Sequence, residues 1–277
     1  MTDLRSKADL LRALHRGPRI LVLPNAWDAA SARLFAAAGF PALATTSAGV
    51  AFSEGYADGE RIPREKMLAR VATVAAAVSV PVTADVEAGY GDAPEAAGET
   101  ARGVLAAGAV GMNLEDWSER SGRLFDLAAQ VERIRAVRAA AGAAGVPLVL
   151  NARTDSFSAG AALPPERRLA EAVQRGNAYR DAGADSVFVP FVSDAPTIER
   201  LAREIHAPLN ILGGPGAPPV KELERLGVRR VTIGSAAMRA TLGLVRRIAG
   251  ELSTEGTFTA LADGIPFAEM QKIFGGD

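Results

Sequence analysis

The stretch VPVTADVEAGYGD, residues 80–92, joins a short apolar run to two carboxylates and a glycine-rich turn. Asp85 and Glu87 are two residues apart, so in an extended strand their side chains lie on one face, about 7 Å apart. Like charges at this spacing repel one another unless a positive group lies between them. The stretch therefore predicts a buried strand with an acidic site at its carboxyl end.

The same pattern, a short apolar run and then a longer amphipathic segment, recurs along the whole chain. Apart from their polar ends, the runs are apolar on both faces, as strands covered on both sides are. With Val80–Glu87 they make eight predicted strands: Arg19–Pro24, Pro41–Ser47, Ala109–Asp116, Val146–Thr154, Ala184–Pro190, Pro208–Gly214 and Arg229–Ser235.

Eight strand–helix units predict an α/β fold, a (β/α)8 TIM barrel of parallel strands, with residues 1–277 as a single domain. An open doubly wound sheet is the alternative. The barrel is favoured because no GxGxxG motif follows the first strand and polar residues gather at the strands' carboxyl ends. We also expect an N-terminal helix, and a C-terminal helical tail from about residue 236 to residue 277 that packs on a partner subunit.

Composition narrows the class of protein. Of the 277 residues, 48% are hydrophobic and 23% charged, and the formal net charge of -1 gives nucleic acid no electrostatic attraction. The absence of cysteine excludes disulfides, thiolate metal sites and cysteine nucleophiles. No run approaches the roughly 18 apolar residues that a membrane span needs. The charged N-terminus lacks the apolar core of a signal peptide, so we expect a cytoplasmic protein with no membrane partner.

The barrel would bring the polar strand ends to one mouth. Asp85, Glu87 and Glu115 are the predicted metal ligands there, because an oxygen-only set suits Mg²⁺. Zinc is disfavoured because the two histidines, His15 and His206, lie away from the strand ends. The alternative is that each carboxylate caps a helix or pairs with Arg153.

Arg153 would supply the positive side of this site, since a guanidinium grips a carboxylate in a bidentate way. The turn at Thr46, Ser47 and Ala48 offers hydroxyl and backbone N–H groups to an anion. A structural ion pair and a plain helix cap are the alternatives. Asn210 is a weaker candidate for the far end of the substrate, and the basic pair Arg229 and Arg230 is expected to be solvated.

Five segments resemble, in order, those of the isocitrate lyase/phosphoenolpyruvate mutase superfamily: LPNAWDAASARLFAAAGF, TTSAGVA, ADVEAGYGD, NLEDW and NARTD. The ordered set is more specific than any single motif. The resemblance implies a TIM barrel that binds Mg²⁺, or Mn²⁺, and a 2-oxo acid. It also implies homodimers or homotetramers in which the eighth helix is exchanged between subunits.

Position by position, the resemblance implies a division of roles. Thr46, Ser47 and Ala48 would hold the substrate carboxylate together with Arg153. Asp85 would be the principal metal ligand, with Glu87, Glu115 and Asp58 reaching the ion directly or through water. Asp58 and Arg153 are the expected catalytic residues.

Two departures from the superfamily pattern limit the activity. The segment EDWSERSGRLFDLAAQVERI, residues 115–134, carries neither the cysteine motif of the lyases' gating loop nor the loop motif of the phosphonate mutases. Phe191 follows Pro190 where the lyases carry a glutamate. Cleavage of isocitrate or methylisocitrate and phosphoryl migration are therefore disfavoured.

Decarboxylation of a 2-oxo acid remains possible because Mg²⁺ can stabilise the enolate that forms when a bond to C3 breaks. Unlike retro-aldol cleavage, this reaction needs no base for a departing hydroxyl. We therefore expect a carbon–carbon lyase of the carboxy-lyase type, with oxaloacetate as the first-choice substrate. The alternatives are a lyase for a substituted malate that recruits Tyr56, Glu119 or Arg120, and a non-catalytic protein that binds a 2-oxo acid such as 2-oxoglutarate.

Overall fold

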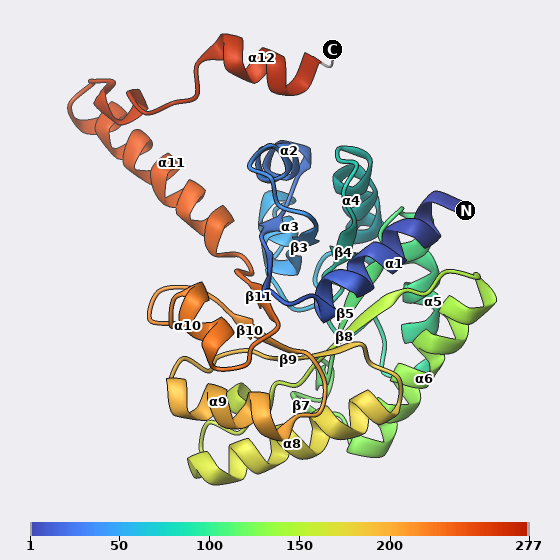
Figure 1. Ribbon diagram of the computed structural model, residues 1–277. Coiled ribbons are helices and arrows are strands. Elements are labelled where there is room, and N and C mark those ends of the chain that lie inside the picture. The colour runs from blue at the N-terminus through green and yellow to red at the C-terminus, as the bar shows by residue number, and fades with distance from the viewer. Residues whose placement is uncertain (1, 276–277) are drawn as a thin grey trace.

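In the computed structural model, which describes residues 2–275, nine strands form one parallel sheet that wraps into a nearly closed barrel (Figure 1). In spatial order the strands are β1 (Leu21–Leu23), β11 (Arg230–Thr232), β10 (Leu209–Leu212), β9 (Ser186–Val189), β8 (Val149–Arg153), β5 (Gly111–Glu115), β4 (Val82–Ala84), β3 (Leu43–Thr45) and β2 (Asn25–Ala26). The two ends of this order, β1 and β2, are consecutive in the chain. The predicted (β/α)8 barrel is therefore confirmed over the doubly wound sheet.

The first predicted strand is split into β1 and β2 at Pro24, which has no backbone N–H to donate. The Asn25 side chain bridges the barrel at this interruption. Its Oδ1 accepts the N–H groups of Ile233 and Gly234 at 2.8 and 2.9 Å, and its Nδ2 donates to the Thr45 carbonyl at 2.7 Å. One side chain thus replaces ladder hydrogen bonds where the sheet closes.

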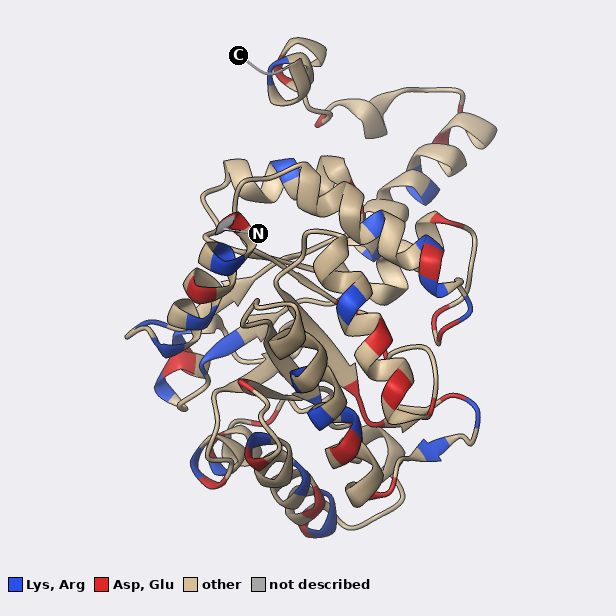
Figure 2. Ribbon diagram, turned by 90° about the vertical axis from the view of Figure 1, so that its right-hand side faces the viewer, with Lys and Arg blue, Asp and Glu red and all other residues tan. Residues whose placement is uncertain are grey.

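Helices surround the barrel and bury their apolar faces against it (Figure 1). They are α2 (Ala29–Ala37), α3 (Ser47–Ser53), α4 (Arg64–Ala76), α5 (Pro94–Ala106), α6 (Leu127–Ala143), α7 (Ser156–Ala159), α8 (Pro165–Asp181), α9 (Ala195–Glu204) and α10 (Val220–Arg225). The predicted N-terminal helix is α1 (Thr2–Arg16), and its Leu11 is fully buried close to Gly111 of β5. Figure 2 shows charges of both signs interspersed along the helices.

One basic residue departs from its predicted place. Arg230, expected to be solvated, is fully buried in β11, with its Nη1 3.4 Å from Nε2 of the buried His15. Side chains alternate between the two faces of a strand, so Arg230 points to the opposite face from Arg229. A buried cation therefore lies in the interior, beside α1.

A short antiparallel hairpin, β6 (Trp117–Ser118) and β7 (Arg123–Leu124), follows β5. It occupies the part of the chain in which the resemblance would place a gating loop.

The tail leaves the barrel after β11. It consists of α11 (Ala236–Thr254), the 3-10 turn η1 (Thr259–Leu261) and α12 (Phe267–Gly275), and Figure 1 shows α11 pointing away from the barrel. Met238 is the one buried residue of α11, whose whole length the structure describes. Near its end the tail returns to its own chain, where Arg33 of α2 donates to the carbonyls of Ile273 and Phe274 at 2.9 and 3.1 Å. Packing of the tail on a partner stays a prediction.

No helix within residues 2–275 combines the length and the apolar character needed to cross a membrane.

Candidate active site

The start of α3 positions the first group of predicted residues. Thr46 is the N-cap of this helix, and its hydroxyl oxygen accepts the Gly49 N–H at 3.3 Å. A Cβ at Gly49 would come within 2.5 Å of the Thr46 methyl carbon, so this tight turn requires glycine. The TTSAG sequence thus brings Ser47 and Ala48 to the mouth of the barrel.

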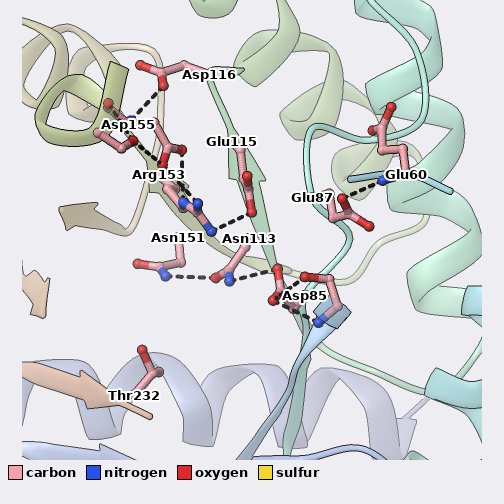
Figure 3. A network of polar contacts seen from close by, with 12 residues as sticks. Glu60, Asp85, Glu87, Asn113, Glu115, Asp116, Asn151, Arg153, Asp155 and Thr232 are labelled. Carbon is pink, nitrogen blue, oxygen red and sulfur yellow. Dashed lines mark hydrogen bonds and ion pairs between the residues drawn. The ribbon is translucent and has the colours of Figure 1, made fainter. Parts of the chain in front are cut away.

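Asp85 follows β4 and is tied to both neighbouring strands (Figure 3). Its Oδ2 accepts the Ser47 N–H at 2.9 Å and the Ser47 hydroxyl at 3.0 Å, while its Oδ1 accepts from Asn113 Nδ2 at 3.3 Å. Its backbone N–H donates to the Thr45 hydroxyl at 2.8 Å. Asp85 is therefore held in one orientation.

A chain of buried polar side chains supports Asp85 from within the barrel (Figure 3). The Ser186 hydroxyl donates to Asn151 Oδ1 at 2.7 Å, and Asn151 Nδ2 donates to Asn113 Oδ1 at 2.8 Å. Asn113 then donates to Asp85. A fully connected buried network of this kind favours a single arrangement of its members.

Glu87 is buried among other carboxylates. Its Oε2 accepts the Glu60 N–H at 2.6 Å, but its buried Oε1 has no hydrogen-bond partner among the residues that the structure describes. Burial, followed by the negative charges of Asp58 and Asp85, raises the pKa of Glu87 to about 8. A cation placed beside this oxygen would satisfy it.

Arg153, at the end of β8, lies among carboxylates. Its Nη1 donates to Glu115 at 2.7 Å, and its Nε and Nη2 donate to the two oxygens of Asp155 at 2.9 and 2.8 Å. Burial acts against the charged guanidinium, but Glu115 and Asp155 outweigh it and raise the pKa of Arg153. The ion pair that was the structural alternative for Arg153 is therefore present, and a role in substrate binding stays a prediction.

The predicted ligand set of Asp85, Glu87 and Glu115 is not gathered around one point. Within residues 2–275, no three histidine or acidic side chains are close enough together to hold a metal ion. Two contacts explain this: Glu115 is turned towards Arg153, and Glu87 towards the N–H of Glu60. Metal binding would require at least one of these glutamates to change its partner.

Two adjoining cavities, of about 490 and 470 Å³, open at this mouth. Ser47, Asp58, Arg153 and Phe191 line both of them. The first adds Thr46, Ala48 and Asp85 to its lining, and the second adds Glu87 and Glu115. Every predicted site residue except Asn210 therefore lines at least one of these two cavities.

Asn210 lines neither cavity. It is fully buried in β10, where its Nδ2 donates to the Thr232 hydroxyl at 3.3 Å. The cavity wall is formed by Leu212 and Gly213 instead, because they lie further along the strand towards the mouth.

Strained backbone marks residues that the sequence did not single out. Within residues 2–275, the non-glycine residues with positive φ are Glu60, Glu87, Tyr90 and Phe191, at 53–64°. Glu87, Tyr90 and Phe191 lie in loops that follow strands, and Glu60 lies in the loop between α3 and α4. Such strain gathers at functional sites. Glu60 joins two of these loops, since its carboxylate accepts the Tyr90 N–H at 2.6 Å while its own N–H donates to Glu87. Glu60 lies in a loop without periodicity, so no sequence signal pointed to it.

These features can be set beside known proteins. A family model described as phosphoenolpyruvate phosphomutase matches residues 11–253. The chain belongs to this family. The predicted resemblance to the isocitrate lyase/phosphoenolpyruvate mutase superfamily is thereby confirmed.

Relatives that carry an assigned activity include lyases and a mutase. They include 2,3-dimethylmalate lyase from Eubacterium barkeri, which is 27% identical over 96% of this chain and 93% of that protein. They also include oxaloacetate decarboxylase from Rhodopseudomonas palustris, which is 28% identical over 99% and 94% of the two chains. Among solved structures, a provisional lyase/mutase from Burkholderia cenocepacia J2315 is 42% identical, with a TM-score of 0.93, over 99% of this chain and 98% of that one.

Proposed function

We propose that this protein is a Mg²⁺-dependent enzyme that breaks a carbon–carbon bond of a small 2-oxo acid, with decarboxylation of oxaloacetate as its reaction. The observation that carries the proposal is the buried, unpartnered oxygen of Glu87. It lies beside Asp58 and Asp85, in a space that also contains the Arg153 guanidinium. A site for such a substrate needs acidic oxygens to bind Mg²⁺ and a positive side chain to bind the substrate carboxylate.

The donor atoms suit magnesium, or manganese in its place. Asp85, Glu87 and Glu115 would hold the ion, and Asp58 would reach it through water. All four offer only oxygen, which hard divalent cations prefer. When bound, the ion would polarise the carbonyl and carboxylate of a 2-oxo acid and stabilise the negative charge that develops as a bond to C3 breaks.

The substrate carboxylate would be held by Arg153 and by the start of α3. The Ala48 N–H lies in the first turn of the helix, where no helical carbonyl is available to accept it. Both the N–H and the hydroxyl of Ser47 donate to Asp85, which favours a supporting role for Ser47 over the expected contact with the substrate. We therefore assign Ser47 to holding Asp85 and Ala48 to the substrate, with the Thr46 cap fixing the turn.

Asp58 is suited to return a proton to C3 after carbon dioxide leaves. Burial, followed by the negative charge of Asp85, raises the pKa of Asp58 and favours its protonated form. Asp58 lines both cavities, which places its carboxyl at the mouth. A positioned acid commonly contributes about 10²–10⁴-fold to rate.

The direct test follows the loss of oxaloacetate by spectrophotometry, with a protein-free Mg²⁺ blank subtracted because the free acid decarboxylates slowly. We expect turnover by the native protein with Mg²⁺, none with excess EDTA, and none from Asp85→Ala. Asp181→Asn is the matched control, because Asp181 is an exposed residue at the end of α8. Absence of turnover by the native protein with Mg²⁺ would overturn the proposal.

One observation favours a second candidate, a lyase for a substituted malate. Glu119 lines the second cavity, and its carboxylate packs against Gly59. Of the acid–base groups predicted for this reaction, Arg120 instead points to Asp92, and Tyr56 packs beside Lys66. Glu119→Gln should abolish cleavage of a substituted malate and leave decarboxylation of oxaloacetate unchanged. Thermal stabilisation by 2-oxo acids without any turnover would instead support the non-catalytic binding protein.

We also infer that α11 and α12 pack on a second copy of the chain, in a dimer or a tetramer. Large apolar side chains of α11 are exposed, among them Leu242, Val245 and Leu252 at 46%, 54% and 47%. A helix that follows a barrel strand normally buries such a face.

A further inference from the structure

Phe191, at the end of β9, combines two unfavourable features at the mouth. Its side chain is 60% exposed, and its φ of 64° is in the left-handed region that bulky residues rarely adopt. Strain of this kind persists only where the surrounding structure imposes it, and it gathers at sites of function. The position of this ring therefore calls for a ligand that would cover it.

The ring of Phe191 is aimed at the proposed substrate site. Its centroid lies 5.9 Å from the Arg153 guanidinium carbon, and the ring of Phe188 lies 5.7 Å from the same atom. Arg153 is thus in contact with two aromatic rings, one buried and one exposed. Phe191 also lines both cavities, so the rest of its ring faces the space where a substrate would lie.

The first cavity is charged at one end and has an apolar patch at the other, beside the polar side chains of Ser193, Thr232 and Ser235. Asp85 and Arg153 belong to the end near β4 and β8, whereas Phe188, Val192, Leu212 and Ile233 line the wall that β9, β10 and β11 provide. Phe188 and Val192 are buried, whereas Leu212 and Ile233 are half-buried and face the cavity. A cavity of about 490 Å³ has more room than a four-carbon acid fills.

We propose that the apolar end is a subsite for an alkyl substituent on C3 of the substrate, with Phe191 as the residue that determines specificity. The inference rests on the proposed function, because it takes the 2-oxo acid group to lie against Asp85 and Arg153. An oxaloacetate that carries an alkyl group on C3 would then be preferred to oxaloacetate itself. A glutamate at position 191, as the resemblance places it in the lyases, would put a charge in this subsite.

Arg239 is an argument for an anionic substituent, instead of an alkyl group, at this end of the first cavity. It lines the first cavity and forms no ion pair with any residue between 2 and 275. However, Arg239 is exposed, so water and salt weaken its attraction for an anion. Phe188 and Val192, beside Phe191, are buried and offer an apolar contact, and the apolar substituent is therefore favoured.

Calorimetry with a series of 2-oxo acids tests the subsite without relying on turnover. Pyruvate, 2-oxobutanoate and 2-oxopentanoate add one methylene at a time, and none has a second carboxylate to lose. With Mg²⁺ present, we expect the Kd of the native protein to fall about fourfold for each buried methylene. Phe191→Tyr keeps the ring and should keep this gradient.

Phe191→Gly should bind all three acids with nearly equal Kd, and Arg239→Gln should keep the gradient of the native protein. The ratio of the Kd values is the readout, because loss of the ring also alters the surroundings of Arg153. Glycine adopts a positive φ without strain, so a melting temperature no lower than the native value shows that this variant is folded.

A flat series in the native protein, or an unchanged gradient in folded Phe191→Gly, would overturn the subsite while leaving the proposed function in place. Loss of the gradient in Arg239→Gln alone would assign the far end to an anionic group and also overturn it. Failure of all three acids to bind would overturn the proposed function together with the subsite.

Discussion

The two halves of the barrel mouth are built from different chemistry. On the side of β4, β5 and β8, Asp85, Glu115 and Arg153 are held by charged hydrogen bonds and by a buried polar chain. On the side of β9, β10 and β11, the cavity wall carries a patch of apolar side chains, and an exposed, strained phenylalanine adjoins it. Under the function proposed above, the acidic half would carry out the reaction and the half with the apolar patch would select the substrate.

The largest loss should come from breaking the ion pairs of the acidic half. Arg153→Met leaves Glu115 and Asp155 buried without their shared partner, which should cost about 3–5 kcal/mol in the free energy of unfolding. Arg153→Met should also abolish oxaloacetate turnover. Arg239 is a cation of the other half, and Arg239→Gln should alter the free energy of unfolding by no more than about 0.5 kcal/mol. Chemical denaturation measures both. An equal loss of unfolding free energy in Arg153→Met and Arg239→Gln would contradict this difference between the two halves of the mouth.

The next largest effect is a pH dependence of the free energy of unfolding, which arises from His15 in the interior beside α1. Because His15 lies outside the mouth, this effect is independent of both halves. The His15 Nδ1–H donates to the Leu11 carbonyl at 2.8 Å, and its Nε2 faces Arg230, an arrangement that suits a neutral ring. Burial, followed by the charge of Arg230, lowers the pKa of His15 from 6.5 to about 4. Between these two values the unfolded chain binds more protons than the folded one, so stability falls as the pH falls from 6.5 towards 4.

For His15 this pH dependence amounts to about 3 kcal/mol, fully present above the unfolded pKa and lost on acidification. Denaturation at a series of pH values should show this slope in the native protein and a smaller slope in His15→Gln. Identical slopes in the two proteins would show that His15 does not account for the loss.

A third test separates the mouth from the tail. Val245→Asp in the exposed face of α11 should reduce the assembly to a monomer, because it places a charge in the proposed contact between copies. Light scattering coupled to size exclusion measures the mass. A monomeric native protein, or an unchanged mass in the variant, would contradict the proposed packing of the tail. Leu10→Ala, which alters an exposed residue of α1, is the control.

The smallest expected effect is a gain in stability in the apolar half. Phe191→Gly removes the strain of a positive φ and should raise the free energy of unfolding by up to about 1 kcal/mol. Phe40→Gly, outside the mouth, has no such strain to lose and should be destabilising. A marked loss of stability in Phe191→Gly would mean that the ring supports the fold and is not held there for a ligand.

The acidic half could be predicted from sequence because its residues follow apolar strands, where the alternation of side chains fixes their direction. Asp85, Glu115 and Arg153 come from such positions, and all line the mouth cavities. Asn210 was predicted to lie at the mouth but is buried in β10, because the alternation of side chains does not show how far a residue lies from the end of its strand. Arg230 was misplaced for a related reason, since a charged pair at the start of a strand does not show which member points inwards.

The conformations of the loops could not be predicted from the alternation of side chains along the strands. Glu60 and the strained backbone of Phe191 depend on turns that no periodicity encodes. The turn of Glu115 towards Arg153 depends on the distance between neighbouring strand ends, which only the folded barrel determines. The metal ligands could be predicted from the sequence, but the contacts of Glu115 with Arg153 and of Glu87 with the Glu60 N–H could not.

We propose above that the acidic half binds a divalent cation. Titration of the metal-free protein with Mn²⁺, followed by electron paramagnetic resonance, measures this directly, with Asp181→Asn as the exposed acidic control. We predict one Mn²⁺ per chain in the native protein and the control, and loss of that binding in Asp85→Ala. Equal Mn²⁺ binding by the native protein and Asp85→Ala, or none by either, would contradict the account.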